Sequence, residues 1–202
     1  MGGQPPSGRA AGVHSRVVGG RRRKETFLIV CEGARTEPHY FEGFRLPTSH
    51  VRVVGAGKNT TSLVADAIRL KNEDPGRDHY WCVFDRDSFP AQTFNNALRN
   101  AQAAGFRVAY SNECFEIWYL LHFDYHDAAL SRALYEPKLS ERLGRKYQKN
   151  DRDMYDLLRT RQPEAITRAR KLLSRYDPHN PEADNPCTTV HELVEDLERQ
   201  LQ

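Results

Sequence analysis

The sequence predicts an α/β fold: a mostly parallel sheet of about four strands, flanked by helices and followed by a helical extension. Two observations lead to this prediction. Up to Tyr125, short apolar runs alternate four times with segments of helical periodicity, which is the pattern of parallel strands joined by helical crossovers. After Tyr125 the strand signals stop and only helical patterns continue. We therefore expect a disordered basic leader over residues 1–24, an α/β domain over residues 25–124, and a helical extension over residues 125–202 packed on the same domain.

Each predicted strand is a short run of β-branched, aliphatic or aromatic residues, bounded by turn signals or by an acidic residue. The first run begins at Thr26 and delivers Glu32 to the end of the strand. The other three cover residues 51–54, 80–84 and 106–112.

Helical periodicity follows each of these strands. The first helix is expected from Thr36, a good N-cap, to about Phe44, and its exposed N–H groups favour an anion. In the last helix, Thr189 and Glu192 have the spacing of a capping box. The remaining helices are expected after Thr60 or Thr61, from near Pro90 to Gly105, and over residues 114–123, 127–145, 151–161, 163–176 and 188–201.

The composition argues against several classes of protein. No apolar run approaches the roughly 20 residues that a bilayer-spanning helix needs, and the first residues lack the apolar segment of a secretory signal. The four cysteines lie far apart and never form a CxxC pair, so a zinc site is not expected. Cys31 and Cys82 lie inside apolar runs, where buried, reduced thiols are expected. Together these observations favour a cytoplasmic protein.

Positive charge is concentrated in two places. Residues 21–24 are all basic and directly precede the first strand, where they either contact nucleic-acid phosphates or keep the strand edge soluble. Residues 125–177 contain 13 Lys and Arg against 8 Asp and Glu, which fits either a polyanion-binding surface or a solvated helical face. Within that stretch Lys146 and Lys149 flank Tyr147, whose ring could stack on a base. A plain surface loop fits these three residues equally well.

Four acidic residues form the candidate site. Glu32 and Asp85 follow predicted strands, and the carboxyl ends of parallel strands share one rim, where ligands bind. Asp87 lies two residues beyond Asp85, so in an extended backbone both side chains point the same way; alternatively, Asp87 or Ser88 caps the next helix. Glu116 is a lone carboxylate in an apolar helical segment and must be paired or bound to a metal, because burying an uncompensated charge is costly. Carboxylates are hard ligands, so Mg²⁺ or Mn²⁺ is the expected ion.

Four segments resemble, in order, the motifs of the RloB-like family of prokaryotic defence proteins. They are CEGARTEPHYF (residues 31–41), WCVFDRD (81–87), CFEIWYLLHF (114–123) and NPCTTV (185–190). The resemblance extends over roughly residues 26–201 and implies a Toprim-like, Rossmann-like fold. By that pattern, Glu32 corresponds to the acid-glycine motif, and Asp85 and Asp87 correspond to the DxD metal motif.

Membership of this family implies a metal-dependent nuclease that acts as the toxic effector of an abortive-infection system, usually alongside an ABC/AAA-type ATPase. A related Toprim effector acts on transfer RNA, so the substrate could be transfer RNA, another RNA or DNA. In this interpretation Asp85 and Asp87 hold the metal, Glu32 is a further ligand or the general base, and Glu116 could hold a second metal. The expected substrate-binding residues are Arg35, Lys146 and Lys149.

Two other interpretations fit the same residues. Residues 84–88 could form a haloacid-dehalogenase-type phosphatase motif, with Asp85 as the nucleophile and Asp87 as the acid, although such motifs usually lie on the first strand. Alternatively, the chain is a Toprim scaffold with inert acids that binds nucleic acid or a partner ATPase through its helical extension. Each interpretation is compatible with a homo-oligomer.

Overall fold

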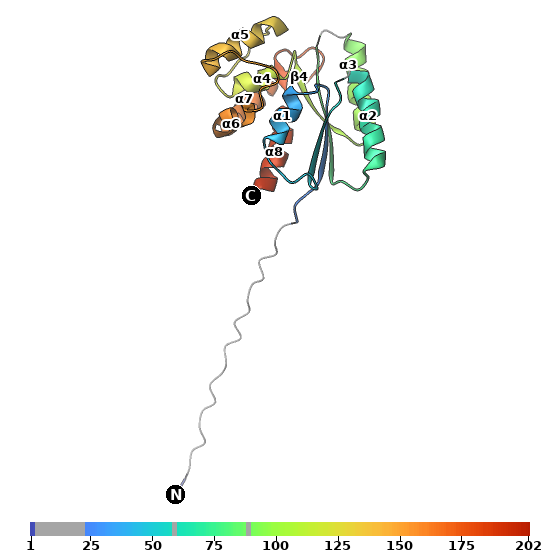
Figure 1. Cartoon of the computed structure of the whole chain (residues 1–202), viewed down its shortest axis with the longest axis vertical. Helices are drawn as coiled ribbons and strands as arrows, with labels where there is room; N and C mark the ends of the chain where they lie inside the picture. Colours follow the sequence, from blue (N-terminus) through green and yellow to red (C-terminus); the bar gives the residue numbers. More distant parts are fainter. Residues whose placement is uncertain (3–22, 58–59, 88–89) are drawn as a thin grey trace.

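A five-stranded sheet runs through the centre of the protein (Figure 1). The structure, a computed structural model, describes residues 1–2, 23–57, 60–87 and 90–202. The strands are β1 (Phe27–Cys31), β2 (Val51–Gly55), β3 (His79–Asp85), β4 (Arg107–Asn112) and β5 (Cys187–Thr188). Their order across the sheet is β2-β1-β3-β4-β5, in which the first four are parallel and β5 is antiparallel to β4. The predicted α/β fold with a mostly parallel, Rossmann-like sheet is confirmed.

The register of the parallel strands brings their carboxyl ends to one rim, called here the carboxyl rim. All five residues of β1 are buried, as expected for a central strand of a parallel sheet. Cys31, the last residue of β1, pairs with Val83 in β3, and β3 continues from there to Asp85. Glu32 follows β1 directly. Glu32 and Asp85 therefore leave two neighbouring strands at the same edge of the sheet.

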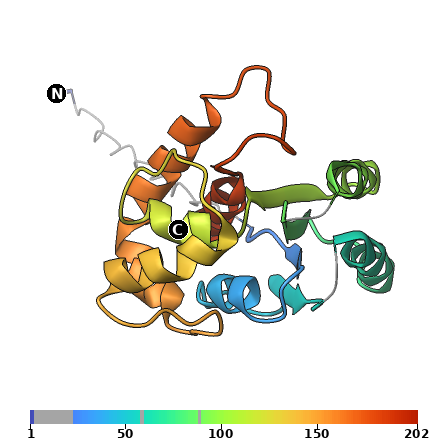
Figure 2. The ribbon, with the colours of Figure 1, turned by 90° about the horizontal axis from the view of Figure 1, so that it is seen from above.

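Helices cover both faces of the sheet. They are α1 (Thr36–Glu42), α2 (Thr60–Glu73), α3 (Ala91–Ala103), α4 (Glu116–Leu121), α5 (Arg132–Leu143), α6 (Met154–Leu158), the 3₁₀ helix η1 (Arg159–Arg161), α7 (Gln162–Leu173) and α8 (Val190–Leu201). Helices α2 and α3 lie together on one side of the sheet, and the others lie on the opposite side (Figures 1 and 2). Alternate residues of β1 serve the two layers: Leu28 and Val30 pack with α2 and α3, and Phe27 and Ile29 pack with the opposite helices.

Several helix starts differ from the sequence prediction, and the differences at α1 and α5 have a structural cause. Thr36 is the first residue of α1 and not its N-cap, which is Arg35; the Thr36 hydroxyl instead donates a 2.7 Å hydrogen bond to the carbonyl of Lys149. The helix expected from residue 127 begins at Arg132. Both differences arise because contacts with distant parts of the chain, which local propensity does not report, fix the ends of these helices.

The prediction that no strand follows Tyr125 is wrong, and so is the predicted capping box at Thr189. In β5, Thr188 pairs with Ser111 of β4, and their hydroxyl oxygens are 2.9 Å apart. The Thr189 hydroxyl accepts a 3.0 Å hydrogen bond from the amide of Tyr110 and lies 3.3 Å from the carbonyl of Val108. Thr189 therefore ties the start of α8 to β4 and does not cap the helix with its side chain.

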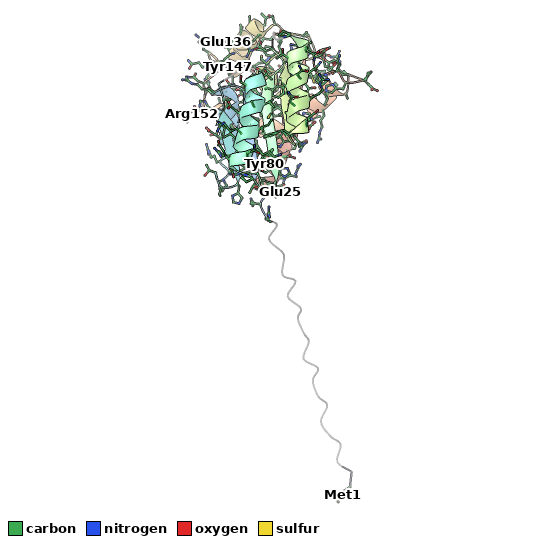
Figure 3. All side chains as sticks on the ribbon, turned by 90° about the vertical axis from the view of Figure 1, so that its right-hand side faces the viewer. Met1, Glu25, Tyr80, Glu136, Tyr147 and Arg152 are labelled. Atoms are coloured by element: carbon green, nitrogen blue, oxygen red, sulfur yellow. The ribbon has the colours of Figure 1, made fainter. Side chains whose placement is uncertain are left out.

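The two ends of the folded region meet at the edge of the sheet opposite the carboxyl rim. The amide of Glu25 donates a 2.9 Å hydrogen bond to Gln200, and the Gln200 side-chain amide donates a 3.1 Å hydrogen bond to the Glu25 carboxylate. Figure 3 shows Glu25 near Tyr80 at one end of the domain, and Tyr147 and Glu136 toward the other. The predicted disordered leader falls almost entirely on residues 3–22, which lie outside the described residues.

The cysteines and the apolar character of the helices were both subjects of prediction from composition. All four cysteines are free and buried, as expected for Cys31 and Cys82. Among the described residues, no helix has the length and apolar character needed to cross a membrane.

Candidate active site

The side chain of Glu32 is hydrogen-bonded to the last residue of β3. One carboxylate oxygen accepts a 3.1 Å hydrogen bond from the amide of Asp85, and the other accepts a 2.8 Å hydrogen bond from the hydroxyl of Thr60. Partial burial raises the pKa of Glu32, and these two hydrogen bonds oppose the shift because they stabilise the charged form. The predicted meeting of Glu32 with the end of β3 is thus present in the structure.

Asp85 is buried among other acids. Its side chain is only 10% exposed, and one carboxylate oxygen lies 3.3 Å from the guanidinium of Arg132. Burial raises the pKa of Asp85 well above its usual value, and the negative charges of Glu37 and Glu116 raise it further. Perturbation of this kind, by desolvation and nearby like charges, is characteristic of functional sites.

Asp87 reaches the same place by a different backbone path from the predicted one. Its φ is 46°, so the chain beyond β3 is not extended and the argument from strand alternation does not apply there. Asp tolerates this left-handed conformation better than most residues. The Asp87 carboxylate lies 2.6 Å from Arg132, which also contacts Asp85. Asp87 does not cap α3, whose N-cap is Pro90; the alternative cap, Ser88, lies outside the described residues.

Glu116 is paired, as its position in an apolar helix required. It is the first residue of α4, and its side chain is 5% exposed. One carboxylate oxygen accepts a 3.2 Å hydrogen bond from the hydroxyl of Tyr147 and lies 3.8 Å from the ammonium of Lys149. Tyr147 is itself buried. The hypothesis that its ring stacks on a base is therefore wrong, because the ring faces the interior and its hydroxyl supports Glu116.

Glu37 belongs to the site and was missed from the sequence. It lies in the first turn of α1, is buried, and has its pKa raised to about 7, chiefly by burial and then by the charges of Glu116 and Glu32. Gly33 makes room for it, since a Cβ at Gly33 would lie 2.1 Å from a Glu37 carboxylate oxygen. The signal for Glu37 was the glycine that follows the first acid, with a second acid one helical turn further on.

Arg132 was also missed. It is the first residue of α5, its side chain is 40% exposed, and its guanidinium contacts both Asp85 and Asp87. These two carboxylates raise its pKa, so it is fully charged. No feature of the sequence distinguishes Arg132 from the other basic residues of the extension.

The three predicted substrate-binding cations are placed differently from one another. Lys149 lies at the site, beside Glu116. Arg35 and Lys146 are exposed, and within the part of the chain that the structure describes neither forms an ion pair with these acids. A cavity of about 340 Å³ opens beside Lys149 and Arg132. Its lining residues are Glu116, Arg132, Ala133, Tyr135, Glu136 and Lys149.

A protein-family model described as RloB-like protein matches residues 27–197. The chain belongs to the RloB-like family. The matched range contains Glu32, Glu37, Asp85, Asp87 and Glu116, together with Arg132 and Lys149. No curated protein and no solved structure matches the chain.

The donor chemistry of this RloB-like site fits a hard divalent cation, since its acids offer only carboxylate oxygens and are largely buried. Their present orientations do not form a chelate: across residues 1–2, 23–57, 60–87 and 90–202, no three His, Cys, Asp or Glu side chains are grouped to hold a metal. Each acid is engaged elsewhere. Asp85 and Asp87 face Arg132, Glu32 faces Thr60, and Glu116 faces Tyr147.

Proposed function

We propose that this chain is a nuclease that hydrolyses phosphodiester bonds with Mg²⁺ or Mn²⁺ as its ion. The observation that carries the proposal is the convergence of acids at the carboxyl rim, where the pKa of Asp85 is raised by burial and then by the charges of Glu37, Glu116 and Glu32. Such a concentration of like charge is unfavourable unless a cation compensates it. An all-carboxylate set at the switch point of a mostly parallel sheet supports a divalent metal site.

The residues have separable roles in this proposal. Asp85, Asp87 and Glu116 would hold the ion, which, when bound, polarises the phosphoryl oxygen and makes water a stronger nucleophile. Glu32 is the proposed general base, because its raised pKa favours proton acceptance and its bonds to Thr60 and the Asp85 amide fix its orientation. Lys149 would bind the substrate phosphate beside the cavity.

The Toprim-like assignment is part of the same proposal. Glu32 followed by Gly33 at the end of β1, and Asp85 with Asp87 at the end of β3, have the order and placement expected of the acid-glycine and DxD motifs. The haloacid-dehalogenase interpretation receives less support. Asp85 is not on the first strand, and its carboxylate contacts Arg132.

Family membership supports a role for the chain in prokaryotic anti-phage defence as the effector of an abortive-infection system. In this role the substrate is RNA, transfer RNA included, or DNA, and an ABC/AAA-type ATPase is the proposed partner that restrains or releases the activity. The proposed location is the cytoplasm, where these substrates are present.

The purified chain, incubated with labelled transfer RNA, single-stranded RNA and duplex DNA, tests the proposal. Cleavage of one of them is expected with Mg²⁺ or Mn²⁺ and not with EDTA. Glu32→Gln should lower the rate by about 10²–10⁴-fold, and Asp85→Asn should abolish cleavage and relieve toxicity in cells. The matched control is Asp124→Asn, which changes an exposed acid paired with Arg142 at 2.7 Å and should leave the rate unchanged.

Full activity of folded Asp85→Asn or Glu32→Gln protein would contradict the mechanism. Binding of nucleic acid without cleavage of any of the three substrates would favour the non-catalytic scaffold instead. Hydrolysis of a generic phosphate monoester that depends on Asp85 would favour the phosphatase.

A further inference from the structure

One guanidinium bridges the two acids of the DxD pair. Arg132 places one terminal nitrogen 2.6 Å from Asp87 and the other 3.3 Å from Asp85. Asp87 lies on the turn after β3, and Arg132 opens α5, which is more than forty residues further along the chain. The bridge therefore joins the helical extension directly to the acids of the carboxyl rim.

The bridge compensates charge where compensation is most needed. The Asp85 side chain is 10% exposed and lies under the influence of Glu37, Glu116 and Glu32. Because the interior has a low effective dielectric, removing the partner of a buried charge is costly. In the metal-free protein, Arg132 thus supplies at Asp85 and Asp87 the positive charge that a divalent cation would otherwise supply.

The Arg132 side chain also has space to move away from Asp85 and Asp87. Its side chain is 40% exposed, against 10% for Asp85, and it lines the cavity of about 340 Å³ that it shares with Lys149. Tyr135, which lines the same cavity, has a buried hydroxyl that finds no hydrogen-bond partner within the described residues. A guanidinium that turns away from the two aspartates would enter a space bordered by Glu136, whose carboxylate can accept hydrogen bonds from it.

We propose that Arg132 is an exchangeable counter-ion: it holds Asp85 and Asp87 while the site is free of metal and releases both when a divalent cation binds. This inference rests on the proposed metal site. The displaced guanidinium stays beside Lys149, where two cations can receive a substrate phosphate. Arg132 thereby raises the Kd for the metal, since breaking the bridge offsets part of the binding free energy.

Titration of Mn²⁺, followed by calorimetry and by the electron paramagnetic resonance signal of free Mn²⁺, tests the exchange without any nucleic acid. Arg132→Met removes the charge and keeps a long side chain, so its Kd for Mn²⁺ is expected to fall about tenfold below the wild-type value. Arg132→Lys, which can contact only one acid well, should give an intermediate Kd. Arg142→Met is the matched control, because Arg142 lies on the same helix and pairs with Asp124 away from these acids.

Thermal unfolding of the same proteins shows whether each variant folds and gives a second measure of the exchange. Without metal, Arg132→Met should melt at a lower temperature than wild type, since the guanidinium that bridges Asp85 and Asp87 is removed. Mn²⁺ should raise the melting temperature of Arg132→Met by more than that of wild type. Arg142→Met should follow wild type in both measurements, and Asp85→Asn should show no Mn²⁺ binding.

The outcomes separate this inference from the proposed function. An equal or higher Kd in folded Arg132→Met, in a protein whose wild type cleaves nucleic acid, overturns the exchange and leaves the nuclease. Tighter Mn²⁺ binding by Arg132→Met, in a protein that cleaves nothing, supports the exchange and removes the nuclease. Failure of both proteins to bind Mn²⁺ rejects the exchange and the metal-dependent function together.

Discussion

The amide of Asp85 donates a 3.1 Å hydrogen bond to the carboxylate of Glu32. This bond adds a side-chain contact to the paired ends of β1 and β3, which are separated by more than fifty residues of sequence. It also fixes the direction of the Glu32 side chain, whose second oxygen is bound by Thr60 at the start of α2. The orientation of Glu32 at the rim is therefore held by the backbone of the sheet and by the side chain of Thr60.

Gly33→Ala is expected to destabilise the protein by about 1–3 kcal/mol, as overpacking of a filled site does. The added Cβ would lie 2.1 Å from the Glu37 carboxylate, so the buried side chain of Glu37 must shift. Urea unfolding measures the change. In the double variant Gly33→Ala/Glu37→Ala the clash is absent, and the two changes should be strongly non-additive; additive effects would show that Glu37 is not the residue that Gly33 accommodates.

Glu37 should make the protein less stable as the pH rises from about 4.5 to about 7. Its pKa is raised from 4.5 to about 7 in the folded state, so the folded protein binds the proton more tightly than the unfolded chain. The favourable contribution is complete below pH 4.5 and is lost as the pH rises through 7, a change of about 3 kcal/mol. Unfolding at several pH values in EDTA, compared with Glu37→Gln, measures this difference.

His122 should change the stability with pH in the opposite direction to Glu37. His122 is buried and its pKa is lowered to about 4, so its neutral form is favoured on folding. Its contribution is lost as the pH falls from 6.5 toward 4, which is the opposite direction to that of Glu37. If the wild-type and Glu37→Gln proteins have parallel stability profiles between pH 4.5 and 7, Glu37 is not perturbed as described.

Tyr147→Phe should cost about 1–3 kcal/mol, because it removes the hydroxyl that donates to buried Glu116. Tyr135→Phe is the matched control. Tyr135 is equally buried, but its hydroxyl has no hydrogen-bond partner in the described part of the chain, so its removal should change the free energy of unfolding by less than about 0.5 kcal/mol. Equal losses in the two variants would contradict the assigned role of Tyr147.

Thr189→Asp distinguishes a helix cap from a tie to the sheet. An Asp at an N-cap is as good as a Thr, so a capping role predicts unchanged stability. In the structure the Thr189 hydroxyl meets both the amide of Tyr110 and the carbonyl of Val108. A carboxylate cannot donate to that carbonyl and is costly to bury, so a loss of about 2 kcal/mol or more is expected in thermal or urea unfolding.

The sheet and two of its acids could be predicted because their signals are local. Apolar runs mark the four parallel strands, and parallel strands end at a common rim, which brings Glu32 and Asp85 together. Strand β5 could not be found this way. It has two residues, too few for any periodicity, and its place is fixed by Ser111 and Tyr110 of β4.

The missed site residues depend on tertiary contacts. A glutamate in the first turn of a helix is usually exposed, whereas the buried carboxylate of Glu37 occupies the space that a side chain at Gly33 would need. Arg132 is one of many basic residues in the extension, and its meeting with Asp87 is set by the fold of the chain between them. Tyr147 was placed on the surface because lysines flank it at positions 146 and 149, whereas α4 provides the acid that its hydroxyl needs.

The hydrogen bonds between Glu25 and Gln200 place both ends of the folded region together, which determines where a tag can be attached. Both ends of the folded region emerge on the pole opposite the acids, so an affinity tag or fluorophore fused at either end is held away from Asp85. Protein tethered to a sensor chip through such a tag would present its carboxylates to the flowing solution. Because the ends already touch, a short linker could join them, and new ends could be opened in a surface loop such as the one at Gly76, where a side chain would meet no atom within 4 Å.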